Sequence, residues 1–530
     1  MGDLSPFAQS IFQRTYQFNP TETWEGCAHR VAHAVANDQK QEEKFFQLIR
    51  DRIFIPGGRY LYTAGRKLQQ FNNCMGFLAE DSREGWASLL HDVTMCLSMG
   101  GGLGVNYSGI RASGAPIDRM GGTASGPIAL MSMVNEIARH VMAGGRRRSA
   151  LWAGLNWNHA DAQAFVDTKS WNDDIKTMKK KNFEYPAPLD QTNISVIIGD
   201  DYLANLKTDA STQRLHMNIC ENMLKTGEPG FLNMSLRLKD DPFAVCTNAC
   251  TEAQLHQHDV CNLMSIVLPR IKSLDHMEEV TRQAIRFLIN GSIKADYPTE
   301  KIAKVAKHNR RIGLGVMGLH EFMLINNHKY EWFDKLERYL QVWKDVSDDE
   351  AEQCATSLLE ATPINKRAIA PTGTISIIAS TTSGIEPIFC SAYKRRYLDG
   401  GKTMFQYVID PTAKRLIDMG IPSKEIEDSY QLSYDVRRRL EVNAQIQTYV
   451  DQAISSTINL PEWGTDSNCN VDSFSALMTE YLPRLKGLTT YPQNSRVGQP
   501  LSPISVEEAL GQEGVVYEET GECQGGVCGL

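Results

Sequence analysis

The sequence predicts an α/β fold whose parallel strands can close into a barrel. Short β-branched, apolar runs alternate along the 530-residue chain with longer amphipathic runs, as in βα units. Glycine clusters such as Gly100–Gly104 stand between these runs rather than inside them. The runs interpreted as strands are Ile194–Ile198, Cys261–Val267 and Ile375–Ala379, and those interpreted as helices are Asp201–Leu224 and His276–Asn290.

Residues 1–54 are predicted to form a helical segment ahead of this alternating region. Its clearest helix has Thr21 as candidate N-cap and apolar residues at helical spacing. These apolar residues are Trp24, Cys27, Val31 and Val35. From Ile55 onward the sequence pattern changes to alternating strand-like and helix-like runs, so we expect the α/β domain at residues 55–496 and a tail at residues 497–530.

Composition limits the class of protein. The chain has 55 Lys and Arg against 63 Asp and Glu, a formal net charge of −8, and 42% hydrophobic residues. Mild acidity argues against a nucleic-acid binder, and no apolar run approaches the roughly 18 residues of a membrane span. The N-terminus has no apolar signal-peptide core. We therefore expect a cytoplasmic protein whose 12 cysteines are mostly thiols.

The tail is predicted to be flexible and acidic. Residues 497–530 contain several Glu and Gly but no Lys, Arg or Asp, and they end in CQGGVCGL. Cys523 and Cys528 can therefore close a small disulfide ring, and we favour a thiol–disulfide shuttle. The alternative is half of a zinc site, which needs a second ligand pair that no neighbouring residue supplies.

A second group of candidate residues lies in the segment VCTNACTEAQLHQHDVC. Asn248, Cys250 and Glu252 alternate, so in an extended loop their side chains share one side. Glu252 is a candidate general acid or base, and Cys250 a candidate nucleophile, reductant or radical carrier. His256 and His258 form an HxH pair, but solvated loop histidines fit better than a metal site because no third ligand is in view.

A third candidate site is APTGTIS. Thr372, Gly373, Thr374 and Ser376 offer hydroxyls and backbone N–H groups that suit a phosphate, although no P-loop GK[ST] follows. A polar turn is the alternative. The GGGLG run lacks the rest of a dinucleotide-binding fingerprint, so a nucleotide-dependent dehydrogenase is disfavoured.

Together, ordered blocks from about residue 6 to residue 496, and then the tail, resemble the catalytic subunit of ribonucleotide reductases, most closely the adenosylcobalamin-dependent class II enzymes. The blocks include PGGRYLYTAG, NNCMGFLAEDS, GGGLGVNYSGIR, GGTASGPIALM, TNACTE, CNLMSI, APTGTISIIASTTSGIEPIF and LKGLTTYPQNSRVGQP. The resemblance implies a ten-stranded α/β barrel with Cys250 on a finger loop threaded through its centre.

The resemblance also implies a role for each candidate residue. Cys250 would carry a transient thiyl radical that abstracts the ribose 3′-hydrogen. Glu252 would take the 3′-OH proton while the 2′-OH leaves as water, and Asn248 would hold the ribose hydroxyls. Cys74 and Cys261 would supply two electrons and become a disulfide, which requires the fold to bring their Cα atoms within about 7 Å.

Other implied roles concern recharging and binding. Cys523 and Cys528 would re-reduce that disulfide and be recharged by thioredoxin or glutaredoxin. Backbone amides of Thr372, Gly373, Thr374, Ile375 and Ser376 would bind the phosphates of a ribonucleoside di- or triphosphate. A deoxynucleoside triphosphate or ATP would act as allosteric effector at Asp81 and at the arginines of GGRRRSA, which are Arg146, Arg147 and Arg148.

The radical source is inferred to be adenosylcobalamin. Class I enzymes carry adjacent tyrosines near the C-terminus and need a ferritin-like partner, whereas this chain has no Tyr-Tyr pair and only Tyr491 in the corresponding block. RVGQP lacks the aromatic residue of a class III glycyl-radical motif. We expect no protein-bound metal. A class I catalytic subunit remains the alternative, and a non-catalytic nucleotide sensor a remote one.

The resemblance favours a homodimer, although RTYQ and RRSA are shared with monomeric class II enzymes. The sequence begins almost directly with the catalytic region, so we expect no N-terminal ATP-cone. Such compactness would suit a phage-encoded enzyme acting in a host cytoplasm. Neither nucleic acid nor membrane is an expected partner.

Overall fold

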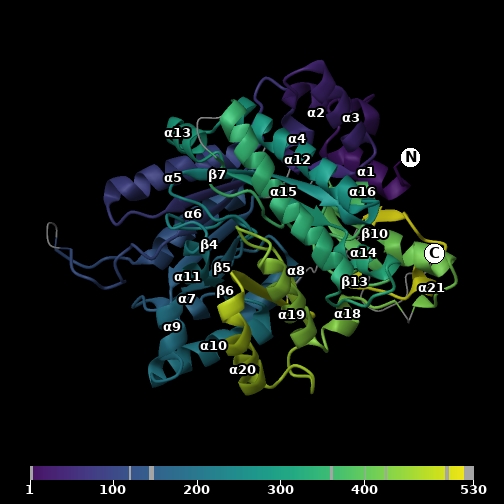
Figure 1. Cartoon of the computed structure of the whole chain (residues 1–530). Helices are drawn as coiled ribbons and strands as arrows, with labels where there is room; N and C mark the ends of the chain where they lie inside the picture. Colours follow the sequence, from purple (N-terminus) through teal and green to yellow (C-terminus); the bar gives the residue numbers. More distant parts are fainter. Residues whose placement is uncertain are drawn as a thin grey trace.

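The computed structural model describes residues 4–117, 121–142, 149–358, 362–399, 402–423, 426–495 and 501–518. It confirms the predicted α/β class, because a ten-stranded sheet forms the centre and helices cover its outside (Figure 1). Among the described residues, no helix is both long enough and apolar enough to cross a membrane.

The chain begins with the helices α1 (Pro6–Thr15), α2 (Trp24–Val35) and α3 (Gln39–Arg50), as predicted. The N-cap of α2 is Thr23, whose hydroxyl accepts a hydrogen bond from the Gly26 N–H, so the expected cap at Thr21 is wrong. The reason is that the capping side chain must stand directly before the first helical residue. The four apolar residues predicted at helical spacing are all buried.

The first half of the barrel consists of five parallel strands in sequence order. They are β2 (Cys74–Leu78), β3 (Gly102–Asn106), β4 (Leu151–Asn156), β5 (Thr192–Ile198) and β6 (Gly230–Asn233). The connecting helices are α5 (Arg83–Ser98), α6 (Pro127–His140), α7 (Ala162–Asp167), α8 (Asp173–Lys181), α9 (Asp200–Asn205) and α10 (Ala210–Thr226). Such helical crossovers are what parallel pairing requires.

The second half of the barrel runs in the opposite direction. β7 (Asp259–Val267) pairs antiparallel with β2 and parallel with β8 (Ile312–Met317). On the other side, β12 (Gly487–Pro492) pairs antiparallel with β6 and parallel with β11 (Thr457–Leu460). β1 (Phe54–Pro56) pairs with the C-terminal part of β7.

Two isolated parallel bridges complete the ring. Leu314 of β8 pairs with Arg367, and Ile369 pairs with Ile454, just before β11. Residues 367–369 therefore take the place of a strand between β8 and β11. The sheet closes into the predicted barrel, with two half-barrels of opposite direction.

The helices of the second half are α11 (Met234–Leu238), α12 (Leu274–Lys294), α13 (Glu300–Asn309), α14 (Leu319–Ile325), α15 (Asp334–Leu358), α16 (Ile375–Ala379), α17 (Pro411–Asp418), α18 (Ser429–Leu432), α19 (Val436–Gln447) and α20 (Val471–Tyr481), with short 3-10 turns at Leu268–Arg270 and Leu482–Arg484. α4 (Gly58–Thr63) follows β1. Two large apolar cores lie between the barrel and these outer helices. A third, small core fills the barrel interior and contains Cys74, Cys246 and Cys261.

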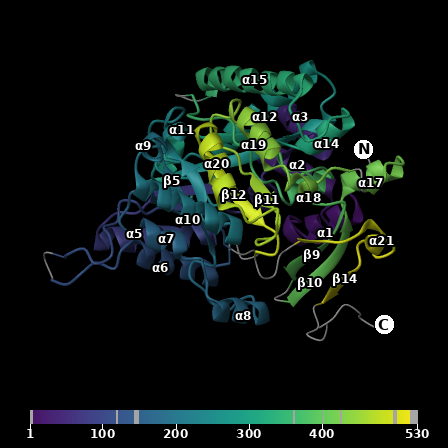
Figure 2. The ribbon, with the colours of Figure 1, turned by 90° about the horizontal axis from the view of Figure 1, so that it is seen from below.

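A separate four-stranded sheet lies beside α1 (Figure 2). The hairpin of β9 (Ala392–Asp399) and β10 (Lys402–Ile409) is flanked by β13 (Leu501–Pro503) and β14 (Val516–Glu518), with α21 (Val506–Ala509) between the last two. The expectation of a flexible tail from residue 497 therefore fails for residues 501–518. Apolar side chains such as Val506, buried with Ala392 and Ile409, hold this segment on the hairpin.

Strands β5 and β7 and helix α12 confirm three of the predicted elements. The predicted strand Ile375–Ala379 is wrong, because these residues form helix α16. A short buried apolar run has no period that separates strand from helix. The predicted helix Asp201–Leu224 is two helices, because Asp209 caps α10 through the Thr212 N–H at 2.6 Å.

Candidate active site

The segment between α11 and β7, residues 245–258, threads through the barrel, and we call it the finger loop. Its residues 247–249 and 252–255 are almost fully buried. A Cβ atom at Gly104 of β3 would lie 1.8 Å from the Thr247 carbonyl oxygen, and one at Gly76 of β2 would lie 2.5 Å from Cys246 Sγ. These two strands therefore need glycine because the loop passes directly against them.

The tip of the finger loop is held by Arg237 of α11. The Arg237 side chain is fully buried and donates to the Thr251 carbonyl at 2.6 Å and the Ala253 carbonyl at 2.9 Å. Its Nε donates to the Lys486 carbonyl at 3.0 Å, directly before β12. One guanidinium thus fixes the backbone on both sides of Glu252.

The two ends of the loop meet at a buried charge cluster. Arg311, directly before β8, contacts Asp241 and Asp259, each at 2.8 Å, and His256 Nε2 lies 2.8 Å from Asp241 Oδ1. These contacts hold the pKa of Asp241 at about 2 in spite of burial, which acts in the opposite direction. His258 lies 3.3 Å from Asp92 of α5. Each histidine of the HxH pair thus contacts a carboxylate.

Four of the predicted catalytic residues converge inside the barrel. Cys74 and Cys261 are directly opposite partners on the antiparallel strands β2 and β7. Asn248 Nδ2 lies 3.1 Å from Cys74 Sγ, and Cys74 Sγ lies 3.6 Å from Glu252 Oε1. Asn248 Oδ1 also accepts the Ala253 N–H at 3.1 Å, which fixes the carboxamide within the loop.

Burial sets the protonation of these groups. It raises the pKa of Cys74, with the Glu252 charge adding to the effect, and it raises the pKa of Cys261. Both are therefore thiols rather than thiolates. Burial also raises the pKa of Glu252, against hydrogen bonds from Asn248 and Cys74 and the charge of Arg237. Glu252 Oε2 is buried and has no hydrogen-bond partner among the described residues, so it can accept one from a substrate.

Cys250, the remaining predicted residue of the finger loop, is half-buried, unlike its neighbours. Thr251, which follows it, has a φ of 67°, so the chain turns sharply at the tip. The turn at Thr251 therefore places the Cys250 thiol at the tip of the finger loop.

The APTGTIS segment lies close to this cluster. The Ile369 N–H donates to the Ala453 carbonyl at 3.1 Å, and the Ala453 N–H donates to the Glu252 carbonyl at 2.9 Å. Thr374 shares a short hydrogen bond with the Tyr16 hydroxyl at the end of α1. A Cβ atom at Gly373 would meet nothing within 4 Å, so the loop faces open space there.

The predicted effector and tail residues are only partly described. Asp81 follows β2 and pairs with Arg111, with Arg111 Nε 2.7 Å from Asp81 Oδ2, on a solvent-facing edge of the barrel. Arg146, Arg147 and Arg148 lie outside the described residues, as do Cys523 and Cys528.

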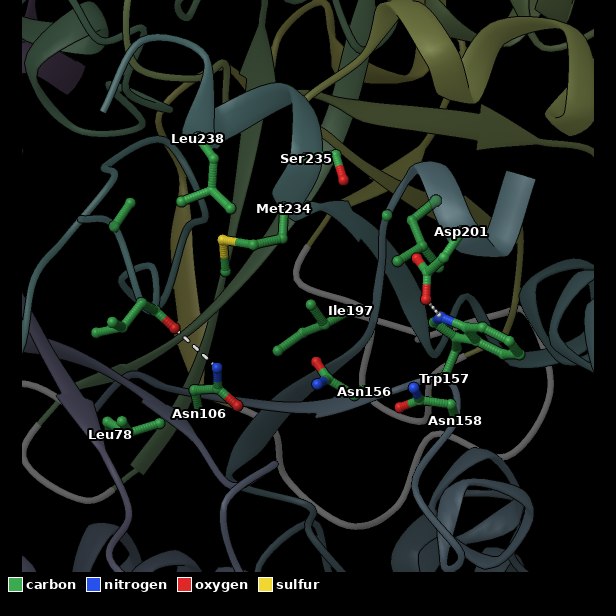
Figure 3. A pocket seen from close by; sticks show the side chains of 14 residues that line it. Leu78, Asn106, Asn156, Trp157, Asn158, Ile197, Asp201, Met234, Ser235 and Leu238 are labelled. Carbon is green, nitrogen blue, oxygen red and sulfur yellow. Dashed lines mark hydrogen bonds between the residues drawn. The ribbon is translucent and has the colours of Figure 1, made fainter. Parts of the chain in front are cut away.

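A pocket of about 310 Å³ opens at the carboxyl ends of β2 to β5, the end opposite Cys74 (Figure 3). Asn106, Asn156, Trp157 and Met234 line it, and Asn106 Nδ2 donates to the carbonyl of Val245, where the finger loop begins. The pocket therefore borders the stem of the loop rather than its tip.

Sequence reasoning missed Arg237, Arg311 and Tyr16. Arg237 has no local motif and Arg311 stands in an Arg-Arg pair that is typical of a surface turn, and only the folded chain brings them to the finger loop. Tyr16 belongs to the RTYQ block, but nothing in that block points to Thr374, 358 positions away.

Models of two protein families match the chain. The ribonucleotide reductase barrel domain matches residues 73–214, 200–337 and 364–491, and the ribonucleotide reductase all-alpha domain matches residues 2–69. A vitamin B12-dependent ribonucleoside-diphosphate reductase of Mycobacterium tuberculosis is 28% identical, over 99% of this chain and 84% of its own length.

Other similar proteins differ in the substrate that they are named for. A protein of Mycobacterium phage D29, provisionally named an adenosylcobalamin-dependent ribonucleoside-triphosphate reductase, is 27% identical over 85% of this chain and 75% of its own length. Among solved structures, the Actinobacillus ureae class Id ribonucleotide reductase alpha subunit matches with a TM-score of 0.74 and 18% identity. That match covers 93% of this chain and 97% of the other, and it supports the fold alone.

Proposed function

The chain belongs to the ribonucleotide reductase family as a large subunit, and its reaction is ribonucleotide reduction, so from this premise we propose that a thiyl radical on Cys250 drives that reaction. The observation that carries the proposal is the convergence of Cys74, Cys261, Asn248 and Glu252 in the barrel interior. A dithiol, a carboxylate and a carboxamide are the groups that the chemistry needs.

In the proposed reaction, the Cys250 thiyl radical takes the 3′-hydrogen atom of the ribose and becomes a thiol. Glu252 Oε2, which is buried without a partner in the described chain, accepts the 3′-OH proton. The 2′-OH leaves as water after taking a proton from one thiol of the Cys74–Cys261 pair, and Glu252 returns its proton to the 3′-oxygen at the end of the cycle. Asn248 holds a ribose hydroxyl from its place beside Cys74.

Cys74 and Cys261 supply the two electrons. Their thiols lose two protons and two electrons and form one disulfide, so ribonucleotide plus dithiol gives deoxyribonucleotide, water and disulfide. The 3′-hydrogen then returns from Cys250 to the sugar, which restores the radical. Neutral thiols suit this step because they bring the protons together with the electrons.

The C-terminal pair, Cys523 and Cys528, would reduce that disulfide by exchange and be recharged by thioredoxin or glutaredoxin. Support comes from the sequence and from the position of β14, which ties the chain to β10 shortly before the cysteine pair. We also keep the division into residues 1–54, 55–496 and 497–530 as a proposal, with redox function assigned to the last.

The loop of residues 372–376 is proposed to bind the substrate phosphates. The Ser376 N–H donates to the Thr372 carbonyl at 2.9 Å, whereas the N–H groups of Thr374 and Ile375 have no hydrogen-bond partner within the described chain, and Gly373 leaves open space beside them. Asp81 and residues 146–148 are proposed to bind a deoxynucleoside triphosphate or ATP as effector in a homodimer, by family similarity.

Adenosylcobalamin is proposed as the radical source, as in the relatives named for it. The residues fit such a role because Cys250, half-buried on an otherwise buried loop, is accessible to a group that approaches its tip. When bound, this cofactor supplies the radical that oxidises the Cys250 thiol. The alternative is a class I subunit that needs a ferritin-like partner, but the chain has no adjacent tyrosines to relay the radical.

One assay tests the proposal. Purified protein is incubated with a ribonucleotide, adenosylcobalamin and dithiothreitol, without a second subunit, and deoxyribonucleotide is measured. We expect turnover, and we expect Cys250→Ala to abolish it. Inactivity that a ferritin-like partner restores would overturn the cofactor assignment, whereas full activity of Cys250→Ala would overturn the radical assignment.

A further inference from the structure

Two arginines meet where α1 packs against the β9–β10 hairpin. The Arg14 guanidinium lies 4.2 Å from the ring centroid of Tyr397, and the Arg395 guanidinium lies 5.6 Å from the same centroid. Arg395 also lies 5.4 Å from the ring of Phe7, on α1. Two positive charges therefore lie beside one aromatic ring in this contact between α1 and the hairpin, which we call the seam.

Neither arginine has a counter-charge within the described part of the chain, where no carboxylate comes within ion-pair distance of either guanidinium. Arg395 Nη1 is buried and has no hydrogen-bond partner there. Burial lowers the pKa of Arg395, and the nearby Arg14 charge lowers it further. Such an arrangement is unfavourable in the free protein, and an anion that contacts both guanidinium groups would relieve it.

The seam adjoins the proposed phosphate loop. Tyr16, two residues after Arg14, hydrogen-bonds Thr374, and α1 contacts α16 (Figure 1). A Cβ atom at Gly58 would lie 3.0 Å from the Tyr16 hydroxyl, so β1 and α4 also close on this point. Helix α1 thus carries both Arg14 and the tyrosine that contacts the proposed phosphate loop.

We propose that Arg14 and Arg395 form a subsite for the outermost phosphate of the substrate, so that this chain prefers ribonucleoside triphosphates to diphosphates. The proposal rests on the proposed function, since it extends the phosphate loop of the same site. Backbone amides of residues 372–376 bind the inner phosphates, and the two guanidiniums add charge-assisted, forked hydrogen bonds to the outer one. The relatives are named for both substrate classes, so the choice must come from the chain itself.

The test compares CTP with CDP for the wild type and for Arg14→Gln and Arg395→Gln. Each variant should lose about tenfold to a hundredfold in kcat/KM for CTP, mainly through KM, because a hydrogen bond to a charged group is lost. The value for CDP should change less than about twofold, since a diphosphate does not reach the pair. Arg437→Gln is the control, because Arg437 also lies near a tyrosine ring, at 5.7 Å, but that ring belongs to α20 rather than to the β9–β10 hairpin.

Two further arms keep the result interpretable. Arg14→Lys and Arg395→Lys keep the charge and should retain most of the CTP preference if the glutamine variants fold poorly. Calorimetric titration with inorganic tripolyphosphate and pyrophosphate measures binding at the subsite without turnover. Tripolyphosphate should bind more tightly than pyrophosphate to the wild type, and this difference should be lost in the glutamine variants. This binding measurement is informative even if the protein reduces no ribonucleotide. Absence of reduction would contradict the proposed function and not the subsite.

Equal losses of kcat/KM for CTP and CDP in the variants would overturn the proposed preference for triphosphates. Equal binding of the two inorganic anions by the wild type would also overturn it. A loss seen with thioredoxin but not with dithiothreitol would also overturn it. That outcome would mean that the arginines guide the acidic C-terminal tail.

Discussion

Cys74 and Cys261 lie directly opposite each other on the antiparallel strands β2 and β7. Opposed residues in such a ladder have Cα atoms about 4.5–5.5 Å apart, which falls within the range for a disulfide. Both side chains are buried in the barrel interior. Two thiols at disulfide distance, shielded from solvent oxidants, are placed to be oxidised by a substrate.

This relationship predicts one specific disulfide after a single turnover. Reduced protein that carries Cys523→Ser and Cys528→Ser, given substrate and cofactor without external reductant, should form about one deoxyribonucleotide per site and link Cys74 to Cys261, because that pair has disulfide geometry and the tail can no longer exchange the disulfide away. Peptide mapping by mass spectrometry checks the linkage. Cys96→Ser is the control, since this buried thiol lies on helix α5, outside the cluster. Product formation by Cys74→Ser at the wild-type level would contradict the assignment.

A second prediction concerns Arg237 and the pH dependence of the reaction. Burial raises the pKa of Glu252, and the Arg237 charge opposes that rise. Glu252 accepts a proton only when ionised, so activity is present above its pKa and is lost as pH falls through it. Arg237→Gln removes the opposing charge, so the acidic limb of kcat/KM should move to higher pH.

Arg237→Lys separates charge from geometry in that experiment. Lysine keeps the positive charge but cannot bind the Thr251 and Ala253 carbonyls as a fork, so kcat should fall while the acidic limb stays near its wild-type position. The Arg237 pKa itself, lowered by burial to about 9, leaves the cation in place at neutral pH. Identical pH profiles for Arg237→Gln and the wild type would exclude the electrostatic role.

The barrel and the cysteine assignments followed from the sequence, whereas the way the finger loop is held did not. Asn248 and Glu252 stand beside Cys250 in the chain, so their convergence needs only a local turn. Arg237 donates hydrogen bonds to backbone carbonyls, which every residue has. No pattern of side chains in the sequence therefore predicts which residues it contacts. The error at Ile375–Ala379 has another origin, because a short buried apolar run has no period that separates a strand from a helix.

A third prediction tests the path of the finger loop. Gly104→Ala places a methyl carbon 1.8 Å from the Thr247 carbonyl oxygen, so the loop must move. We expect a loss of about 1–3 kcal/mol or more in the free energy of unfolding, measured by denaturant titration, and a large loss of kcat. Gly102→Ala on the same strand is the control, because its nearest contact is at 3.4 Å. Equal stability of the two variants would mean that the loop does not pass against β3 as described.

The last prediction concerns the tail. Cys523 and Cys528 stand five and ten residues beyond Glu518, where β14 is held on β10, so an extended tail spans at most about 17–36 Å from that anchor. If this pair reduces the Cys74–Cys261 disulfide, Cys523→Ser with Cys528→Ser should abolish turnover with thioredoxin and leave single-turnover reduction intact. Dithiothreitol, which is small enough to enter the site, should restore multiple turnover. Cys469→Ser is the matched control, because Cys469 is an exposed thiol outside the tail. Unchanged thioredoxin-dependent turnover in the double variant would show that thioredoxin reaches the buried pair without the tail, and the shuttle would then be wrong.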